Sequence, residues 1–184
     1  MFIQTEATPN PTTLKFLPGE AVISGSPIDF RRDKDFSFSP LAKRLFEIDG
    51  VEGVFLGADF ITVTKDNDEW QQLKPAVLGA IMEHYMSGEA VVEGLEAAPE
   101  GAEDFDEADS EIVSTIKELL DTRVRPAVAQ DGGDITFHGF KNGIVSLQMK
   151  GACSGCPSST ATLKHGIENL LKHFIPEIKE VRAV

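Results

Sequence analysis

The chain has 184 residues, of which 41% are hydrophobic and 26% are charged, and its formal net charge is −13. This composition is typical of a soluble globular protein with one ordinary domain or two small ones. No apolar run approaches the ~20 residues of a membrane span, and neither half has the basic excess typical of nucleic-acid binding. The sequence therefore predicts neither a membrane protein nor a nucleic-acid partner.

The negative charge is concentrated in one short stretch. Residues 87–111 hold ten acidic residues and no basic one, whereas residues 112–184 hold seven acidic and nine basic residues. Closely spaced like charges among Ala, Gly and Pro repel one another and bury too little surface to become ordered. We therefore expect an acidic flexible linker at 88–109 between two small domains, 1–87 and 110–184.

The first domain is expected to mix strands and helices. Ser39 and Pro40 open one helix, because serine caps a helix and proline suits its first position. A longer helix follows, capped by Asp68, and we interpret its Trp70 as an anchoring aromatic and its His84 as a surface imidazole. Nothing in this domain has the spacing of a catalytic or phosphate-binding site. The strand-like runs are 2–7, 13–16, 51–56 and 60–65.

The second domain is expected to follow the order α-β-β-α-β. Its first helix begins at Ser110, continues past Arg125 with a bend and stops at the glycine pair 132–133. Asn142-Gly143 lies between two strand-like runs and predicts a hairpin. The remaining elements are expected at 135–140, 144–149, 158–174 and 178–184, the last as an edge strand. The fold class is thus α+β, with two small mixed domains.

Cys153 and Cys156 are the only cysteines of the chain. A soft-metal or iron–sulfur site usually needs four thiolates, so one copy of the protein provides half of a site. The simplest completion is a second copy. Because Cys156 directly precedes Pro157 at the expected start of a helix, the helix dipole lowers the pKa of its thiol and favours the thiolate.

Three interpretations of this Cys-x-x-Cys pair remain open from the residues alone. A dithiol redox centre is expected after the first strand of a βαβ unit, whereas this pair follows a hairpin. A structural zinc site could recruit His165 and His173, but their spacing does not match that of a zinc finger. An iron–sulfur cluster shared between two chains is the third interpretation.

Several segments together resemble Nfu/NifU-like iron–sulfur cluster scaffold and carrier proteins. Residues 151–160 (GACSGCPSST) match the C-terminal domain of that family, and residues 1–11 (MFIQTEATPNP) match its separate N-terminal domain. Supporting segments lie at 14–19, 125–126, 131–134 and 162–168. Only the acidic linker matches nothing in the family pattern.

The resemblance implies a carrier that is not an enzyme. It implies a [4Fe–4S] cluster at a homodimer interface, with Cys153 and Cys156 of each copy as ligands, and transfer of the cluster to apo-proteins. It also implies an upstream cluster donor and an N-terminal domain that helps to recognise clients. The [4Fe–4S] type comes from the resemblance alone, since two thiolates per chain suit a [2Fe–2S] cluster equally well.

The start of the chain gives an expectation about location. Residues 1–6 contain neither a basic leader with an apolar core nor an Arg-rich amphipathic presequence. We therefore expect a bacterial cytoplasmic protein or, as the alternative, a mitochondrial matrix protein whose presequence has been removed.

Overall fold

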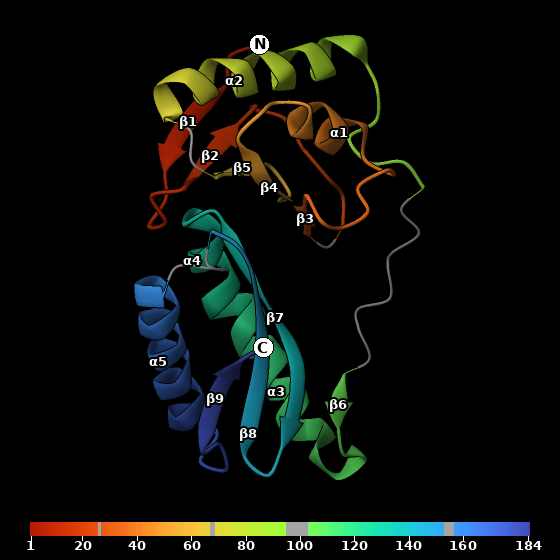
Figure 1. Ribbon diagram of the computed structural model, residues 1–184. Coiled ribbons are helices and arrows are strands. Elements are labelled where there is room, and N and C mark those ends of the chain that lie inside the picture. Colours follow the sequence, from red (N-terminus) through yellow and green to blue (C-terminus); the bar gives the residue numbers. More distant parts are fainter. Residues whose placement is uncertain (26, 67–68, 95–102, 153–156) are drawn as a thin grey trace. The chain divides into compact units, whose positions relative to one another are not determined.

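The computed structural model describes residues 1–25, 27–66, 69–94, 103–152 and 157–184, without the side chains of 157–160. The chain divides into two compact units, Met1–Ala98 and Pro99–Val184, each with its own core (Figure 1). This confirms the α+β class and the two domains. Within the described residues, no helix has the length and apolar character to cross a membrane.

The first unit is built on a five-stranded sheet with the strand order β1-β2-β5-β4-β3, in which every neighbouring pair is antiparallel. Its two helices, α1 and α2, lie side by side on the sheet (Figure 1). The elements are β1 (Gln4–Ala7), β2 (Thr13–Leu17), β3 (Ile28–Arg31), α1 (Pro40–Phe46), β4 (Val51–Leu56), β5 (Ile61–Lys65) and α2 (Trp70–Ser87).

Local chemistry explains where these helices begin. Ser39 caps α1 as expected: its hydroxyl oxygen accepts from the amide of Ala42 at 3.1 Å, and Pro40 occupies the first turn. Trp70 opens α2 and donates from its indole nitrogen to the carbonyl of Pro11 at 3.2 Å, which confirms its anchoring role. The expected cap Asp68 lies outside the described residues.

The prediction for His84 is wrong. Its side chain is fully buried, because it lies on the same face of α2 as Leu73, Val77 and Ile81, which pack into the first core. Neither ring nitrogen has a hydrogen-bond partner among the described residues. The nearest carboxylate oxygen, on Glu89, is 4.0 Å from Nδ1.

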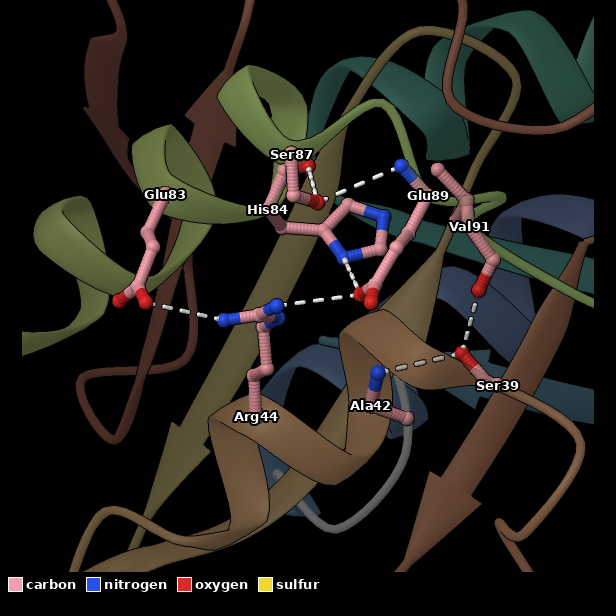
Figure 2. A network of polar contacts seen from close by, with 8 residues as sticks. All are labelled: Ser39, Ala42, Arg44, Glu83, His84, Ser87, Glu89 and Val91. Carbon is pink, nitrogen blue, oxygen red and sulfur yellow. Dashed lines mark hydrogen bonds and ion pairs between the residues drawn. The ribbon is translucent and has the colours of Figure 1, made fainter.

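A polar network surrounds this histidine at the end of α2 (Figure 2). Arg44 of α1 forms ion pairs with Glu83 at 3.2 Å and with Glu89 at 3.1 Å. The Ser87 hydroxyl donates to the carbonyl of His84 at 2.6 Å and accepts from the amide of Glu89. Burial, reinforced by the positive charge of Arg44, lowers the pKa of His84.

The buried histidine predicts an acid-sensitive first unit. Since its pKa is lowered on folding, the unfolded chain binds the proton more readily, and stability should fall as the pH drops below ~6.5, the ordinary value for histidine. The measurement is urea unfolding followed by the fluorescence of Trp70, the only tryptophan, at pH 7.5, 6.5 and 5.5. The variant His84→Leu should flatten this dependence, whereas His138→Gln, at an exposed position of the second unit, should preserve it. An equal pH slope in His84→Leu would refute the assignment.

The second unit is built on a four-stranded sheet with the order β6-β7-β8-β9. The central pair β7–β8 is antiparallel, and both edge strands pair in parallel with their neighbours. The elements are β6 (Asp104–Phe105), the short helix η1 (Glu107–Asp109), α3 (Ser110–Leu119), the π-helical turn η2 (Leu120–Val124), α4 (Arg125–Gln130), β7 (Gly133–Lys141), β8 (Ile144–Gly151), α5 (Pro157–Phe174) and β9 (Glu180–Ala183).

The hairpin forms where the sequence predicts it, whereas the helix before it is interrupted earlier than expected. Asn142 and Gly143 have φ angles of 54° and 80°, as a two-residue hairpin turn requires. The expected helix continues past Arg125, but the irregularity lies before it: the π-helical turn η2 at Leu120–Val124 interrupts the helix, and such turns are a common cause of helix bending. Val145 and Leu147 of β8 are buried in the second core, whereas Phe174 at the end of α5 is 47% exposed.

The acidic segment, defined here as residues 88–109, has contacts at both ends. Val91 and Val92 pack against the first core, and the hydroxyl of Ser39 donates to the carbonyl of Val91 at 2.7 Å. At the other end, Asp104 and Phe105 form β6. The domain boundaries 1–87 and 110–184 and the flexibility of the linker stay predictions.

Candidate metal centre

The two cysteines lie between the end of β8 and the start of α5. Cys153 and Cys156 themselves are outside the described residues, but both flanks of their loop are described. Gly151 ends β8 opposite Gly133, and the amide of Ala152 donates to the carbonyl of Gly132 at 3.2 Å. Ala152 is only 3% exposed. The backbone directly before Cys153 is therefore fixed to the turn between α4 and β7.

A partly buried ion pair joins α4 to β7 across that turn. The Arg125 guanidinium of α4 donates from Nε and Nη2 to the two carboxylate oxygens of Asp134, both at 3.0 Å. The Asp134 side chain is 5% exposed and that of Arg125 is 33% exposed. A second carboxylate, on Asp121, accepts from Nη1 at 3.0 Å. Such bidentate geometry fixes both position and orientation.

The electrostatics of this pair follow from its contacts. The hydrogen bond to Asp134, with a further one to Asp121, raises the pKa of Arg125, so the guanidinium stays charged at any physiological pH. In the β7–β8 register, Asp134 lies opposite Lys150. Lys150 comes two residues before Ala152 in the chain. The end of the hairpin that leads to Cys153 thus carries charges of both signs.

The histidines considered for a zinc site are exposed. His165 and His173 are exposed residues of α5, and His138 is exposed at the β-bulge of β7. Among the described residues, no three His, Cys, Asp or Glu side chains come together as a metal site would require. Lys150 and Lys164, which lie close to the cysteines in sequence, are partly buried.

The Arg125–Asp134 pair was not predicted as part of this centre. In the sequence, Arg125 marks the expected bend of the helix and Asp134 belongs to the turn after it, and both lie in segments that resemble the family, but no local pattern pairs them. Opposite charges nine positions apart can meet only if a tight turn folds the strand back beside the helix, as the glycine pair allows here. An arginine and an aspartate on either side of a glycine pair are therefore the sequence pattern from which this ion pair could have been predicted.

Two sequence families match the chain. Residues 3–88 match "Scaffold protein Nfu/NifU N terminal", and residues 116–182 match "NifU-like domain". The second match contains both cysteines, the hairpin, α5 and most of β9, and the first covers the whole sheet of the first unit together with α1 and α2.

Full-length relatives agree with these matches. The chain is 50% identical to human "NFU1 iron-sulfur cluster scaffold homolog, mitochondrial" over 100% of its own length and 72% of the relative. It is 52% identical to "NifU-like protein 4, mitochondrial" of Arabidopsis thaliana over 98% of its own length and 65% of the relative. The chain thus spans about two thirds of the length of these relatives.

A solved structure is also similar in sequence. The solution structure of a NifU-like protein from Saccharomyces cerevisiae is 29% identical, with a TM-score of 0.46, and the match covers 50% of this chain and 84% of that one.

The expectation of a bacterial cytoplasmic protein is wrong. The relatives that match along the whole chain at 50–52% identity are named mitochondrial. The prediction failed because the folded domains of a bacterial protein and of a processed mitochondrial protein look alike in sequence. The residues of the folded domains therefore do not indicate the compartment.

Three findings point to the same family. Each half of the chain matches one of its domains, the relatives are similar along the whole chain, and the chain has a Cys-x-x-Cys pair before α5. The chain belongs to the Nfu/NifU-like family of scaffold proteins.

Proposed function

We propose that two copies of this protein hold one [4Fe–4S] cluster, with Cys153 and Cys156 of each copy as its ligands, and that the cluster then passes to apo-proteins. The cluster is cargo, so the protein acts as a scaffold and carrier and not as an enzyme. An upstream donor provides the cluster or its components. The first unit, which has no cysteine, helps to recognise the recipients.

The observation that carries this proposal is the number of sulfur donors. A [4Fe–4S] centre takes four thiolates, and each chain has two cysteines, three positions apart before a helix. The names of the relatives, which refer to iron–sulfur cluster scaffolds, support the same function. The position before α5 favours thiolates, since the amides at a helix start and the helix dipole stabilise a negative charge.

Sharing a cluster between two copies suits delivery. A thiolate of the recipient can replace a thiolate of the carrier on iron, one for one, without a change in the oxidation state of the cluster. Each replacement frees one cysteine of the carrier, and the cluster no longer joins the two copies once both thiolates of one copy have been replaced. Neither folded unit has to open for the cargo to leave.

Anaerobic reconstitution with iron and sulfide tests the proposal. The expected result is about four irons and four acid-labile sulfides per dimer, as a cluster with four cysteine ligands requires. Size-exclusion chromatography with light scattering, run without oxygen, should show a dimer whenever the cluster is present. Incubation with an apo-protein that needs a [4Fe–4S] cluster should then move iron and sulfide to the recipient in equal amounts.

Other outcomes would contradict the proposal. About two irons and two sulfides per dimer would indicate a [2Fe–2S] cluster. Zinc bound to a stable monomer would favour a structural zinc module. Turnover of a disulfide substrate by the metal-free protein would favour a dithiol oxidoreductase.

A further inference from the structure

The two ends of the acidic segment are held by different units, each through contacts of its own. We call Glu89–Glu93 the N-terminal latch and Glu103–Phe105 the C-terminal latch. Every contact described below lies within one unit, so neither latch depends on how the two units are arranged.

The N-terminal latch rests on α1 (Figure 2). Glu89 forms an ion pair with Arg44 at 3.1 Å. Further along, Ser39, which is fully buried, donates to the carbonyl of Val91, and the amide of Glu93 donates to the carbonyl of Phe38 at 2.7 Å. Hydrogen bonds to the backbone, an ion pair and apolar packing together fix this stretch against the first core.

The C-terminal latch rests on β7. Asp104 and Phe105 pair in parallel with Gly139 and Phe140, and the Phe105 ring lies 6.3 Å from that of Phe137. Beside them, Glu103 forms an ion pair with Lys117 of α3. The ammonium group of Lys117 also lies 5.6 Å from the centroid of the Phe137 ring. The edge of β7 thus binds an extended segment in which acidic residues precede an aromatic one.

Gly139 is the residue that admits this strand. A Cβ atom at Gly139 would lie 2.8 Å from the backbone oxygen of Asp104, closer than such contacts are tolerated. Its φ angle is not positive, so alanine could adopt the same backbone conformation within β7. The missing side chain is therefore needed for the close approach of β6.

We propose that the edge of β7 is a strand-docking site for Glu103–Phe105. Together with the N-terminal latch, the docked strand shortens the tether, by which we mean the stretch of chain between the two latches. Glu93 and Glu103 are ten positions apart in the chain, so their Cα atoms can lie at most about 36 Å from each other. If β6 leaves β7, the tether extends to Glu107 and its limit rises to about 50 Å. Docking of β6 thereby limits how far the cysteine-bearing unit moves from the other unit.

The test uses the full chain with the single substitution Gly139→Ala. Hydrogen exchange followed by mass spectrometry should show faster exchange at 103–105 and at the paired edge of β7, residues 139–140, with no change at 89–93 or in β8. The distribution of distances between labels at Lys43 and Glu118, attached through azide-bearing amino acids, should extend to longer values by up to ~14 Å. Gly166→Ala is the matched control, because the space around Gly166 is open.

A charge exchange gives a second, independent test. Lys117→Glu should also release 103–105, and Lys117→Glu combined with Glu103→Lys should restore protection by re-forming the ion pair. Unchanged exchange at 103–105 in Gly139→Ala would overturn the proposal. Faster exchange across the whole sheet would do the same, because the added methyl group would then disturb the unit instead of releasing one strand.

Discussion

Cys153→Ala, and separately Cys156→Ala, should leave less than about one tenth of the iron that the unchanged protein holds after anaerobic reconstitution. The reason is stoichiometric. Each substitution removes two of the four thiolates from a dimer, and the two that remain cannot satisfy four irons. Iron, sulfide and visible absorbance measure the loss of the cluster, and light scattering measures the expected loss of the dimer.

The matched control is Ser154→Ala, which changes a side chain between the two cysteines without removing a thiolate. It should retain the cluster and the dimer. The unfolding midpoint of each metal-free variant, measured beside that of the unchanged protein, checks that the second unit still folds. Iron content and pairing that survive in Cys153→Ala would contradict the proposed ligand set.

Arg125→Ala should destabilise the second unit by about 2–3 kcal/mol, below the full 3–5 kcal/mol for breaking a buried pair because Arg125 is partly exposed to solvent. The substitution leaves the carboxylate of Asp134 buried and without its bidentate partner. Unfolding of the second unit is measured by far-ultraviolet circular dichroism. The fluorescence of Trp70 follows the first unit in the same sample, and its transition should not move.

Two further variants distinguish the contribution of the Arg125–Asp134 pair from that of the more exposed Arg125–Asp121 contact. Arg125→Lys keeps the charge but loses the bidentate geometry, so it should recover only part of the stability. Asp121→Asn removes the partner that is 61% exposed and should cost no more than about 1 kcal/mol, as exposed ion pairs generally do. An equal loss for Asp121→Asn and Arg125→Ala would show that the buried carboxylate is not the cause.

Most of the regular structure could be predicted from local patterns. The serine–proline start of α1 and the Asn142-Gly143 turn are short-range signals that tertiary contacts did not override. Strands β3 and β6 were missed for different reasons. Ile28–Arg31 has only two apolar residues beside a pair of arginines, whereas Asp104–Phe105 pairs only because Gly139 and Lys117, distant in sequence, admit and hold it.

The candidate centre could be predicted only in part. The cysteine pair is evident because the chain has no other cysteine. The ion pair that fixes the turn beside it depends on three-dimensional proximity, and the burial of His84 was missed although its spacing from Ile81 and Val77 continues the apolar face of α2. His84 was predicted to lie at the surface because histidine is polar, although its position in the helix places it on the buried face.

The π-helical turn between α3 and α4 has a consequence for how this helix tolerates changes in length. A π turn holds one residue more than an α turn, so Leu120–Val124 contains the equivalent of a single-residue insertion. Deleting one residue there would turn this stretch into regular α-helix and leave the direction in which α4 faces nearly unchanged, whereas deleting one residue within α3 would rotate the two parts of the helix by about 100° relative to each other. Arg125 would still face Asp134 after the first deletion but not after the second, so the π turn is the place where this helix can change its length without losing its register with the turn beside Cys153.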